Sequence, residues 1–136
     1  MTITRRTLVS ATAIGALAPR LGHSQAPKLR IGVMNDQSGP YRDDGGPTGV
    51  LCVRQAVQEF AAGSGMEVEV LTADHQNKPD VGAGIARQWF DSDGVDAVVD
   101  VPTSSVALAV NTVCREKNKV MLNRGAATTD LTGAQC

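Results

Sequence analysis

Apolar residues follow two alternating patterns along the chain. Short, almost continuous apolar runs predict β-strands, and these runs are residues 29–34, 68–73, 97–101 and 120–122. Each segment between two runs repeats apolar residues at spacings of three and four, which predicts one face of a helix. These positions are Val50, Val53, Val57 and Phe60 in the first segment, Val81, Ile85 and Trp89 in the second, and Val106, Val110 and Val113 in the third.

The resulting order, βαβαβαβ, predicts an α/β fold with a doubly wound parallel sheet. Strands that alternate with helices of about a dozen residues are typical of such sheets, which carry helices on both faces. Right-handed crossovers bring the C-terminal ends of the strands to one edge, where ligands bind in open α/β folds. The segments expected at that edge are residues 35–49, 74–79, 102–105 and 124–132.

Glycines and capping side chains mark the expected helix ends. Gly63 and Gly65 are expected to end the first helix, and Gly94 the second. Asp80 is a candidate N-cap of the second helix, and the hydroxyl groups within residues 103–105 are placed to cap the third.

Composition narrows the class of protein. The chain has 136 residues, which suggests about one domain, and its 42% hydrophobic and 20% charged residues are typical of a globular protein. Aromatic residues make up 3% and the net charge is −1, so no stacking platform or basic surface for nucleic acid is expected. The longest apolar run is far shorter than the roughly 20 residues that span a bilayer.

Positive charge is concentrated at the N-terminus. Residues 1–26 contain three arginines and no acidic residue, whereas the rest of the chain holds 10 basic and 14 acidic residues. A short apolar stretch at residues 8–17 and a small-x-small triplet at residues 24–26 complete the layout of a secretory signal. We therefore predict an exported mature chain of residues 27–136. The adjacent pair of arginines leaves the choice between the Sec and twin-arginine routes open.

The three cysteines, Cys52, Cys114 and Cys136, allow at most one internal disulfide. Cys52 and Cys114 fall on predicted helices, and the sequence leaves the disulfide state open. No CxxC motif and no His/Cys cluster with zinc-ligand spacing occurs, so we expect no metal site and no cofactor.

Two features are typical of enzymes, but each lacks its partner motif. The glycine-rich segment 45–49 has no phosphate-loop pattern and lies near Asp36, Asp43 and Asp44, which repel phosphate. His75 is the only histidine of the mature chain, and no G-x-S-x-G elbow supplies a serine for it. We expect an exposed loop histidine, with an exported hydrolase that uses His75 as one alternative function.

Ser104 and Ser105, at the start of the third predicted helix, allow two interpretations. Their hydroxyl groups cap the helix, or the free N–H groups and the helix dipole there hold a ligand carboxylate. Residues 126–129 follow the fourth predicted strand and form either an ordinary turn or a second ligand contact. Their small side chains would let a ligand approach the backbone.

Four segments together carry a resemblance to a known family, and they are residues 31–41, 73–79, 99–105 and 125–128. They resemble the periplasmic substrate-binding proteins of ABC importers, in the branched-chain amino acid (leucine)-binding-protein-like family. The resemblance covers residues 28–136 and implies a type I fold of two lobes that close on a ligand. Members are more than twice as long, so residues 27–136 are expected to be an incomplete N-terminal lobe. Such a fragment would expose apolar surface and bind ligand weakly or not at all by itself.

The resemblance also implies a function and a site. The protein is expected to be a periplasmic, non-enzymatic binder of an amino acid or an aromatic or other organic carboxylate. Its expected protein partners are the permease subunits of an ABC transporter. A ligand-sensing domain of a signalling receptor, which shares the fold, is the main alternative. The expected ligand contacts are Tyr41, Ser104, Ser105, Ala126, Ala127 and Thr128.

Arg124 departs from the family pattern, in which small residues or proline are usual at this place. It is expected either to pair with a ligand carboxylate or to face solvent.

Overall fold

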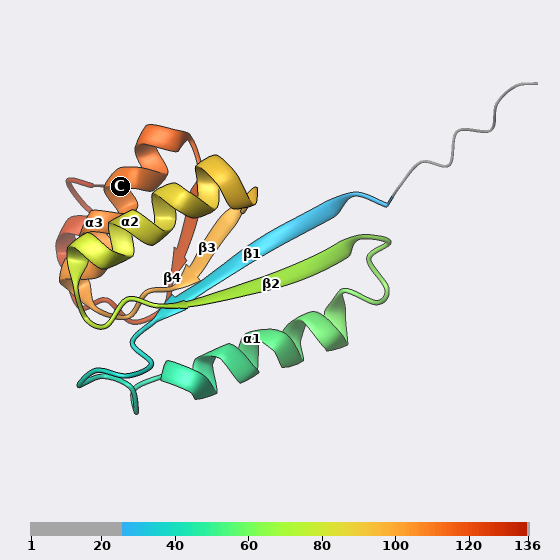
Figure 1. Ribbon diagram of the computed structural model, residues 1–136, viewed down its shortest axis with the longest axis horizontal. Helices are drawn as coiled ribbons and strands as arrows, with labels where there is room; N and C mark the ends of the chain where they lie inside the picture. The colour runs from blue at the N-terminus through green and yellow to red at the C-terminus, as the bar shows by residue number, and fades with distance from the viewer. Residues whose placement is uncertain (1–25, 136) are drawn as a thin grey trace, which may run out of the picture.

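A single four-stranded parallel sheet forms the centre of the molecule (Figure 1). The structure, a computed structural model, describes residues 26–135. In chain order the strands are β1 (Lys28–Asn35), β2 (Glu67–Asp74), β3 (Ala97–Asp100) and β4 (Val120–Asn123). They lie side by side in the order β2-β1-β3-β4, and every neighbouring pair is parallel. The predicted α/β fold class and the βαβαβαβ order along the chain are therefore confirmed.

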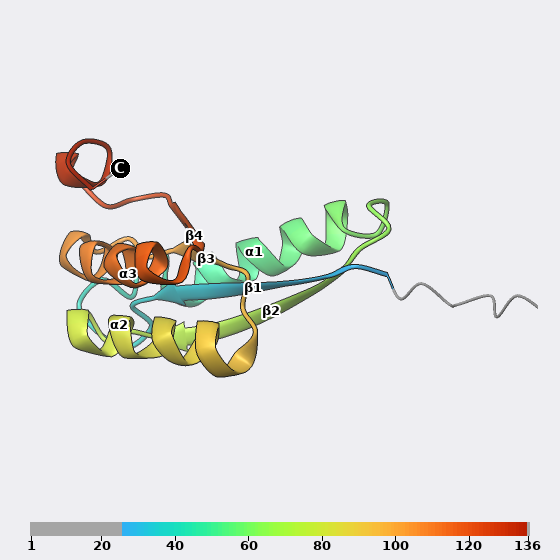
Figure 2. The ribbon, with the colours of Figure 1, turned by 90° about the horizontal axis from the view of Figure 1, so that it is seen from above.

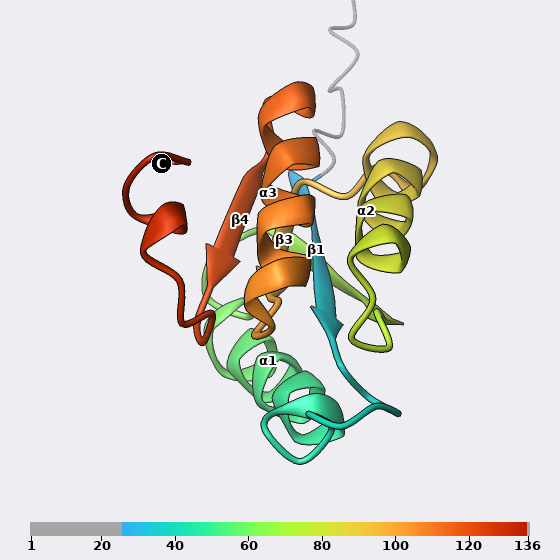
Figure 3. The ribbon, with the colours of Figure 1, turned by 90° about the vertical axis from the view of Figure 1, so that its left-hand side faces the viewer.

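Helices cover both faces of the sheet, as predicted. Helix α1 (Gly46–Phe60) lies on one face, and α2 (Pro79–Gln88) and α3 (Ser104–Lys117) lie together on the other (Figures 2 and 3). The chain leaves β1 in one direction to reach β2 and returns past β1 to reach β3. The boundary between β1 and β3 is therefore the topological switch point, the place where ligands bind in open α/β sheets.

The hydrophobic core lies between the sheet and the α2–α3 pair. Its members are mostly small or β-branched, and they include Met34, Ala83, Ala86, Trp89, Val98, Val106, Val110 and Val113. The predicted apolar face of α3 is buried as expected.

The buried face of α2 differs from the predicted one. Gly82, Ala83 and Ala86 are buried, whereas Val81 and Ile85 are only partly buried. Small residues face α3 because the two helices approach closely. A methyl group on Gly82 would lie 2.6 Å from Cγ1 of Val106.

Two helix beginnings also differ from expectation. Helix α1 starts at Gly46, with a proline in its first turn, where the fixed φ of proline suits a helix. Asp80 lies inside the first turn of α2, and Lys78 occupies the N-cap position. A carboxylate in the first turn still interacts favourably with the helix dipole. Gly94, with φ of 67°, ends the π-helical turn (Trp89–Asp93) that follows α2, as predicted.

The face of the sheet that carries α1 is incompletely covered. A groove of about 730 Å³ runs between α1 and the sheet, and apolar side chains line most of it. Phe60 at the end of α1 is 76% exposed, and Leu122 on β4 is 61% exposed. Apolar surface is therefore open to solvent on this side, as the sequence predicted. Within residues 26–135, no helix combines the length and apolar character needed to cross a bilayer.

The predicted signal segment, apart from Ala26, and Cys136 lie outside the described residues. Cys52 and Cys114 are free thiols, the first exposed and the second buried. Burial raises the pKa of the Cys114 thiol to about 11.

Candidate functional site

A cavity of about 470 Å³ lies at the C-terminal edge of the sheet, beside the switch point between β1 and β3. Three loops enclose it, those that follow β1, β3 and β4. The residues that line it are Tyr41, Asp44, Pro102, Thr103, Ser104, Ser105, Gly125 and Ala127. Four of the six predicted ligand contacts, Tyr41, Ser104, Ser105 and Ala127, are thus brought together although they are far apart in the sequence.

The wall that carries Tyr41 is organised by a buried carboxylate. Asp36, directly after β1, is fully buried and accepts hydrogen bonds from the backbone N–H groups of Gly39 (2.7 Å) and Tyr41 (2.9 Å). The loop therefore folds around Asp36, and the Tyr41 side chain is left 49% exposed at the cavity.

Asp74, at the end of β2, holds the same loop from the other side. Its carboxylate accepts hydrogen bonds from the Ser38 hydroxyl (2.5 Å) and from the backbone N–H groups of Gln37 (3.0 Å) and Gln76 (2.8 Å). Partial burial opposes ionisation, but these hydrogen bonds outweigh it and hold the pKa of Asp74 below its ordinary value of 3.8.

The second wall is the N-terminus of α3. Thr103 is the N-cap residue, and Ser104 and Ser105 lie in the first turn. No side chain caps the helix, so the predicted capping role of the hydroxyl groups is wrong. The first N–H groups of a helix have no acceptor within it, and they are suited to an anion. The buried Thr103 Oγ1 atom, which forms no hydrogen bond, adds a polar group at the cavity.

The third wall follows β4. The Asn123 side-chain oxygen accepts hydrogen bonds from the backbone N–H groups of Gly125 (3.2 Å) and Ala126 (2.9 Å), which turns the chain toward the cavity. Ala127 lines the cavity, whereas Ala126 packs against the core. Thr128 lies just beyond, and its hydroxyl accepts a hydrogen bond from the backbone of Asp130 (3.3 Å). Ala126 and Thr128 are therefore beside the cavity rather than in its lining.

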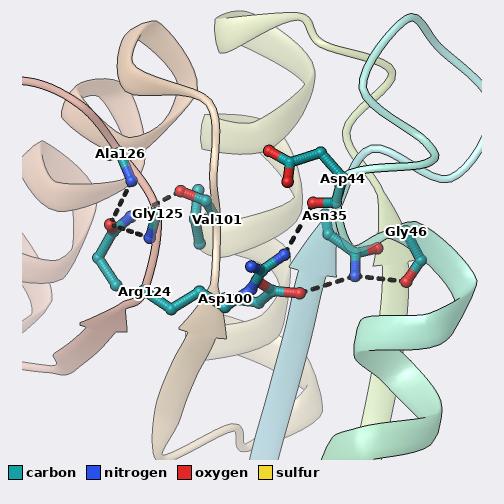
Figure 4. Close-up of polar contacts among 9 residues, drawn as sticks. Asn35, Asp44, Gly46, Asp100, Val101, Arg124, Gly125 and Ala126 are labelled. Carbon is teal, nitrogen blue, oxygen red and sulfur yellow. Dashed lines mark hydrogen bonds and ion pairs between the residues drawn. The ribbon is translucent and has the colours of Figure 1, made fainter.

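Arg124 makes contacts that the sequence did not reveal. Its Nε donates to Oδ1 of Asp100 (2.5 Å), and its Nη2 donates to the backbone oxygen of Asp44 (2.8 Å) (Figure 4). Asp100, at the end of β3, is buried and also accepts a hydrogen bond from the Asn35 side chain (2.9 Å). Arg124 thus pairs with a carboxylate of the protein itself, and it does not line the cavity.

The backbone is in an uncommon conformation where this network meets β3. Asp100 has φ of 83° and Val101 has φ of 42°, both in the left-handed region that β-branched residues rarely adopt. Two hydrogen bonds hold the backbone of Val101 in place. Its N–H donates to the backbone oxygen of Met34 (2.8 Å), and its backbone oxygen accepts a hydrogen bond from the side-chain amide of Asn123 (2.6 Å). Strain of this kind clusters at functional sites.

His75 is fully buried, so the expectation of an exposed loop histidine is wrong. Its Nδ1 accepts a hydrogen bond from the backbone N–H of Asn77 (3.0 Å). Burial, partly offset by the negative charges of Asp36 and Asp74, lowers the pKa of His75 below its ordinary value of 6.5. His75 therefore acts as a neutral turn-forming residue. Within the part of the chain that the structure describes, no cluster of three or more potential metal ligands exists.

The cavity offers hydrogen-bond donors that are suited to a small anion. Helix N–H groups, hydroxyl groups and small side chains surround it, and among residues 26–135 Asp44 is the only residue of its lining with a charged side chain. No basic side chain of the described residues lines it, so a ligand carboxylate would rely on backbone and hydroxyl donors.

The family model for periplasmic binding proteins matches residues 28–136. A search of curated proteins found no match.

Solved structures give a more detailed comparison. A periplasmic binding protein from Burkholderia mallei is 42% identical with a TM-score of 0.77, and the match covers 82% of this chain and 30% of that one. A branched chain amino acid ABC transporter periplasmic ligand-binding protein from Burkholderia xenovorans LB400 is 38% identical with a TM-score of 0.71, covering 79% and 29%. An ABC transporter solute binding protein from R. palustris, in complex with 4-hydroxybenzoate, shares the fold at 24% identity and a TM-score of 0.67, covering 77% and 29%. The chain thus spans about 30% of the length of these structures.

Proposed function

The chain belongs to the periplasmic binding protein family, and on that premise we propose that it is the solute-binding component of an ABC importer. It is exported to the periplasm, where its partners are the permease subunits of the transporter. It has no enzymatic role. Residues 1–26 form the export signal, and residues 27–136 form the first part of the N-terminal lobe.

The observation that carries this proposal is the position of the cavity. It lies at the topological switch point, where the β1, β3 and β4 loops meet, and the N-terminus of α3 opens into it. In a two-lobe protein this edge faces the second lobe, and closure of the lobes buries the ligand.

The ligand class is a small carboxylate, either an amino acid or an aromatic acid. Ser104 and Ser105 hold the carboxylate through the N-terminal turn of α3, and Tyr41 contacts the ligand side chain. Ala126, Ala127 and Thr128 supply the remaining contacts of this lobe after small rearrangements that bring Ala126 and Thr128 to the cavity. Structures similar to this chain come from a branched chain amino acid transporter and from a complex with 4-hydroxybenzoate, which supports both ligand classes.

A hydrolase that uses His75 gains no support from the geometry. His75 is buried, and its hydrogen bond joins it to the backbone of Asn77 rather than to a serine or cysteine. A catalytic base needs a nucleophile within hydrogen-bond reach.

The test is NMR titration of the chain with two probes, leucine and 4-hydroxybenzoate. At least one probe should shift the backbone amide signals of Ser104 and Ser105, and the double variant Ser104→Ala with Thr128→Ala should weaken that response about tenfold or more, equivalent to about 1.4 kcal/mol. Thr112→Ala, on the exposed side of α3, is the matched control. Equal titrations in the double variant and the control would refute the assignment of the site.

A further inference from the structure

We propose that Arg124 is a positioning residue of this site, which holds the β1–α1 loop and the β4 loop at the spacing that ligand binding requires. The proposal rests on the function proposed above, because the spacing matters only if the cavity binds a ligand. Arg124 itself touches neither the cavity nor the ligand in this scheme.

One guanidinium, that of Arg124, joins two walls of the cavity. Arg124 directly follows β4, and its Nη2 reaches the backbone oxygen of Asp44, 80 positions earlier in the chain, at 2.8 Å (Figure 4). Asp44 lines the cavity on one wall, and Gly125, the residue after Arg124, lines it on another. A shift of the Arg124 side chain would therefore move the two walls relative to each other.

The carboxylate that anchors this guanidinium is itself held in place. Asp100 has 3% of its side chain exposed, and it receives the Arg124 Nε at 2.5 Å and the Asn35 amide at 2.9 Å. The same amide nitrogen donates to the backbone oxygen of Gly46 at 2.8 Å. Asp100 therefore fixes the end of the β1–α1 loop through two side chains. Arg124 binds the backbone oxygen of Asp44, and Asn35 binds the backbone oxygen of Gly46.

Two neighbouring glycines leave room for the Arg124–Asp100 ion pair. Gly45 has φ of 123°, and a methyl group there would overlap the Arg124 Nη2 atom. At Gly49 a methyl group would lie 2.6 Å from Oδ2 of Asp100. Both side chains of the ion pair are thus packed directly against the backbone of the loop and the first turn of α1.

Lysine cannot replace this arginine in full. A planar guanidinium donates in two fixed directions at once, whereas an ammonium is a compact point charge on a flexible stem. Arg124→Lys keeps a charge near the buried Asp100 and so keeps the fold, but it loses the simultaneous contact with the Asp44 backbone. Arg124→Gln removes the charge as well and leaves Asp100 without its counter-ion.

The experiment is amide hydrogen exchange on the whole chain without ligand, followed by titration with leucine and 4-hydroxybenzoate. Arg124→Lys and Arg124→Gln are compared with Arg87→Gln, which removes a surface arginine of α2. We expect Arg124→Lys to raise exchange about tenfold in residues 37–45 and 125–128 and to leave α2 unchanged, because local opening is independent of global unfolding. Probe affinity should fall by a similar factor, and Arg87→Gln should change neither quantity.

The outcomes separate the two proposals. Exchange that is unchanged in both loops, or that rises equally in α2, overturns the positioning role whatever the ligand. The positioning role is also overturned if Arg124→Lys raises exchange in the two loops but binds a probe as tightly as the unmodified chain does. If the unmodified chain binds neither probe, residues 26–135 do not form the proposed site by themselves, and the exchange data alone decide whether Arg124 fixes the loops.

Discussion

The backbone N–H of Tyr41 donates to the carboxylate of Asp36 at 2.9 Å, so a fully buried acid fixes a residue that lines the cavity. The other oxygen of Asp36 accepts from Gly39 at 2.7 Å. Both carboxylate oxygens therefore accept hydrogen bonds from the backbone of the same loop. The shape of this wall of the cavity depends on one side chain at the end of β1.

Asp36→Asn should destabilise the chain by about 1–3 kcal/mol, because the amide group of asparagine presents a donor to a backbone N–H where an acceptor is needed. Chemical denaturation monitored by circular dichroism measures the change. Asp43→Asn, at an exposed position in the same loop, should stay within about 0.5 kcal/mol of the unmodified chain. Equal effects of the two substitutions would show that Asp36 does not organise the loop.

The sequence was sufficient to predict the fold because strands and helices depend on local periodicity. It was also sufficient to place Tyr41, Ser104 and Ala127 at one edge, since each follows a strand and the C-terminal ends of parallel strands lie at the same edge of the sheet. The Arg124–Asp100 pair was not predictable, because its partners are 24 residues apart and meet only after β3 and β4 pair. Asp100 was nevertheless visible as an acidic residue within the otherwise apolar run 97–101, which is a signal for a buried carboxylate with a partner.

Two glycines of α2 should respond to alanine in opposite directions. Gly82→Ala places a methyl group 2.6 Å from Cγ1 of Val106, and overpacking of this kind costs about 1–3 kcal/mol. Gly84→Ala meets no atom within 4 Å and should stabilise the helix by about 0.5–1 kcal/mol, because alanine has the higher helix propensity. Thermal unfolding of both variants measures the difference, and a loss of stability in Gly84→Ala would contradict the described packing of α2.

His75 should make the stability of the chain depend on pH below about 6.5, its ordinary pKa. Burial lowers the pKa of His75 in the folded state, so the unfolded chain takes up a proton first as the pH falls. The contribution of His75 is therefore fully present above pH 6.5 and is lost as the pH falls toward the lower folded pKa.

The matched variant for this prediction is His75→Asn. The asparagine side-chain oxygen can accept the Asn77 N–H that Nδ1 of histidine accepts, so the turn is kept while the titrating group is removed. Free energies of unfolding measured from pH 7.5 down to pH 5.5 should fall more steeply in the unmodified chain than in the variant. Parallel pH profiles would exclude His75 as the source of the dependence.

Asp44 should distinguish the two ligand classes. It has the only charged side chain that the described part of the chain contributes to the lining of the cavity. A carboxylate there attracts the ammonium group of an amino acid but repels a simple acid. Asp44→Asn should weaken the NMR response to leucine several-fold and leave or slightly strengthen the response to 4-hydroxybenzoate. Asp43→Asn controls for the change in net charge, and equal losses for both probes would mean that Asp44 plays no part in selectivity.

Exposed apolar surface on the α1 side should make the chain associate with itself. Leu122 lies on β4, the strand at one edge of the described sheet, and it is 61% exposed beside the groove under α1. Open strand edges and apolar patches of this kind promote contact between copies of a chain. Leu122→Lys should lower the weight-average mass in sedimentation velocity at high protein concentration. Because the position is exposed, the folding free energy should change by only about 0.5 kcal/mol.

Thr112→Lys, which adds the same charge to the exposed side of α3, should leave self-association unchanged. This control separates loss of apolar contact from general charge repulsion. If both lysine variants reduce the mass equally, the association is electrostatic in origin and the groove is not responsible. If Leu122→Lys alone reduces it, the contact involves the apolar face between α1 and the sheet, the face that is least covered in the described part of the chain.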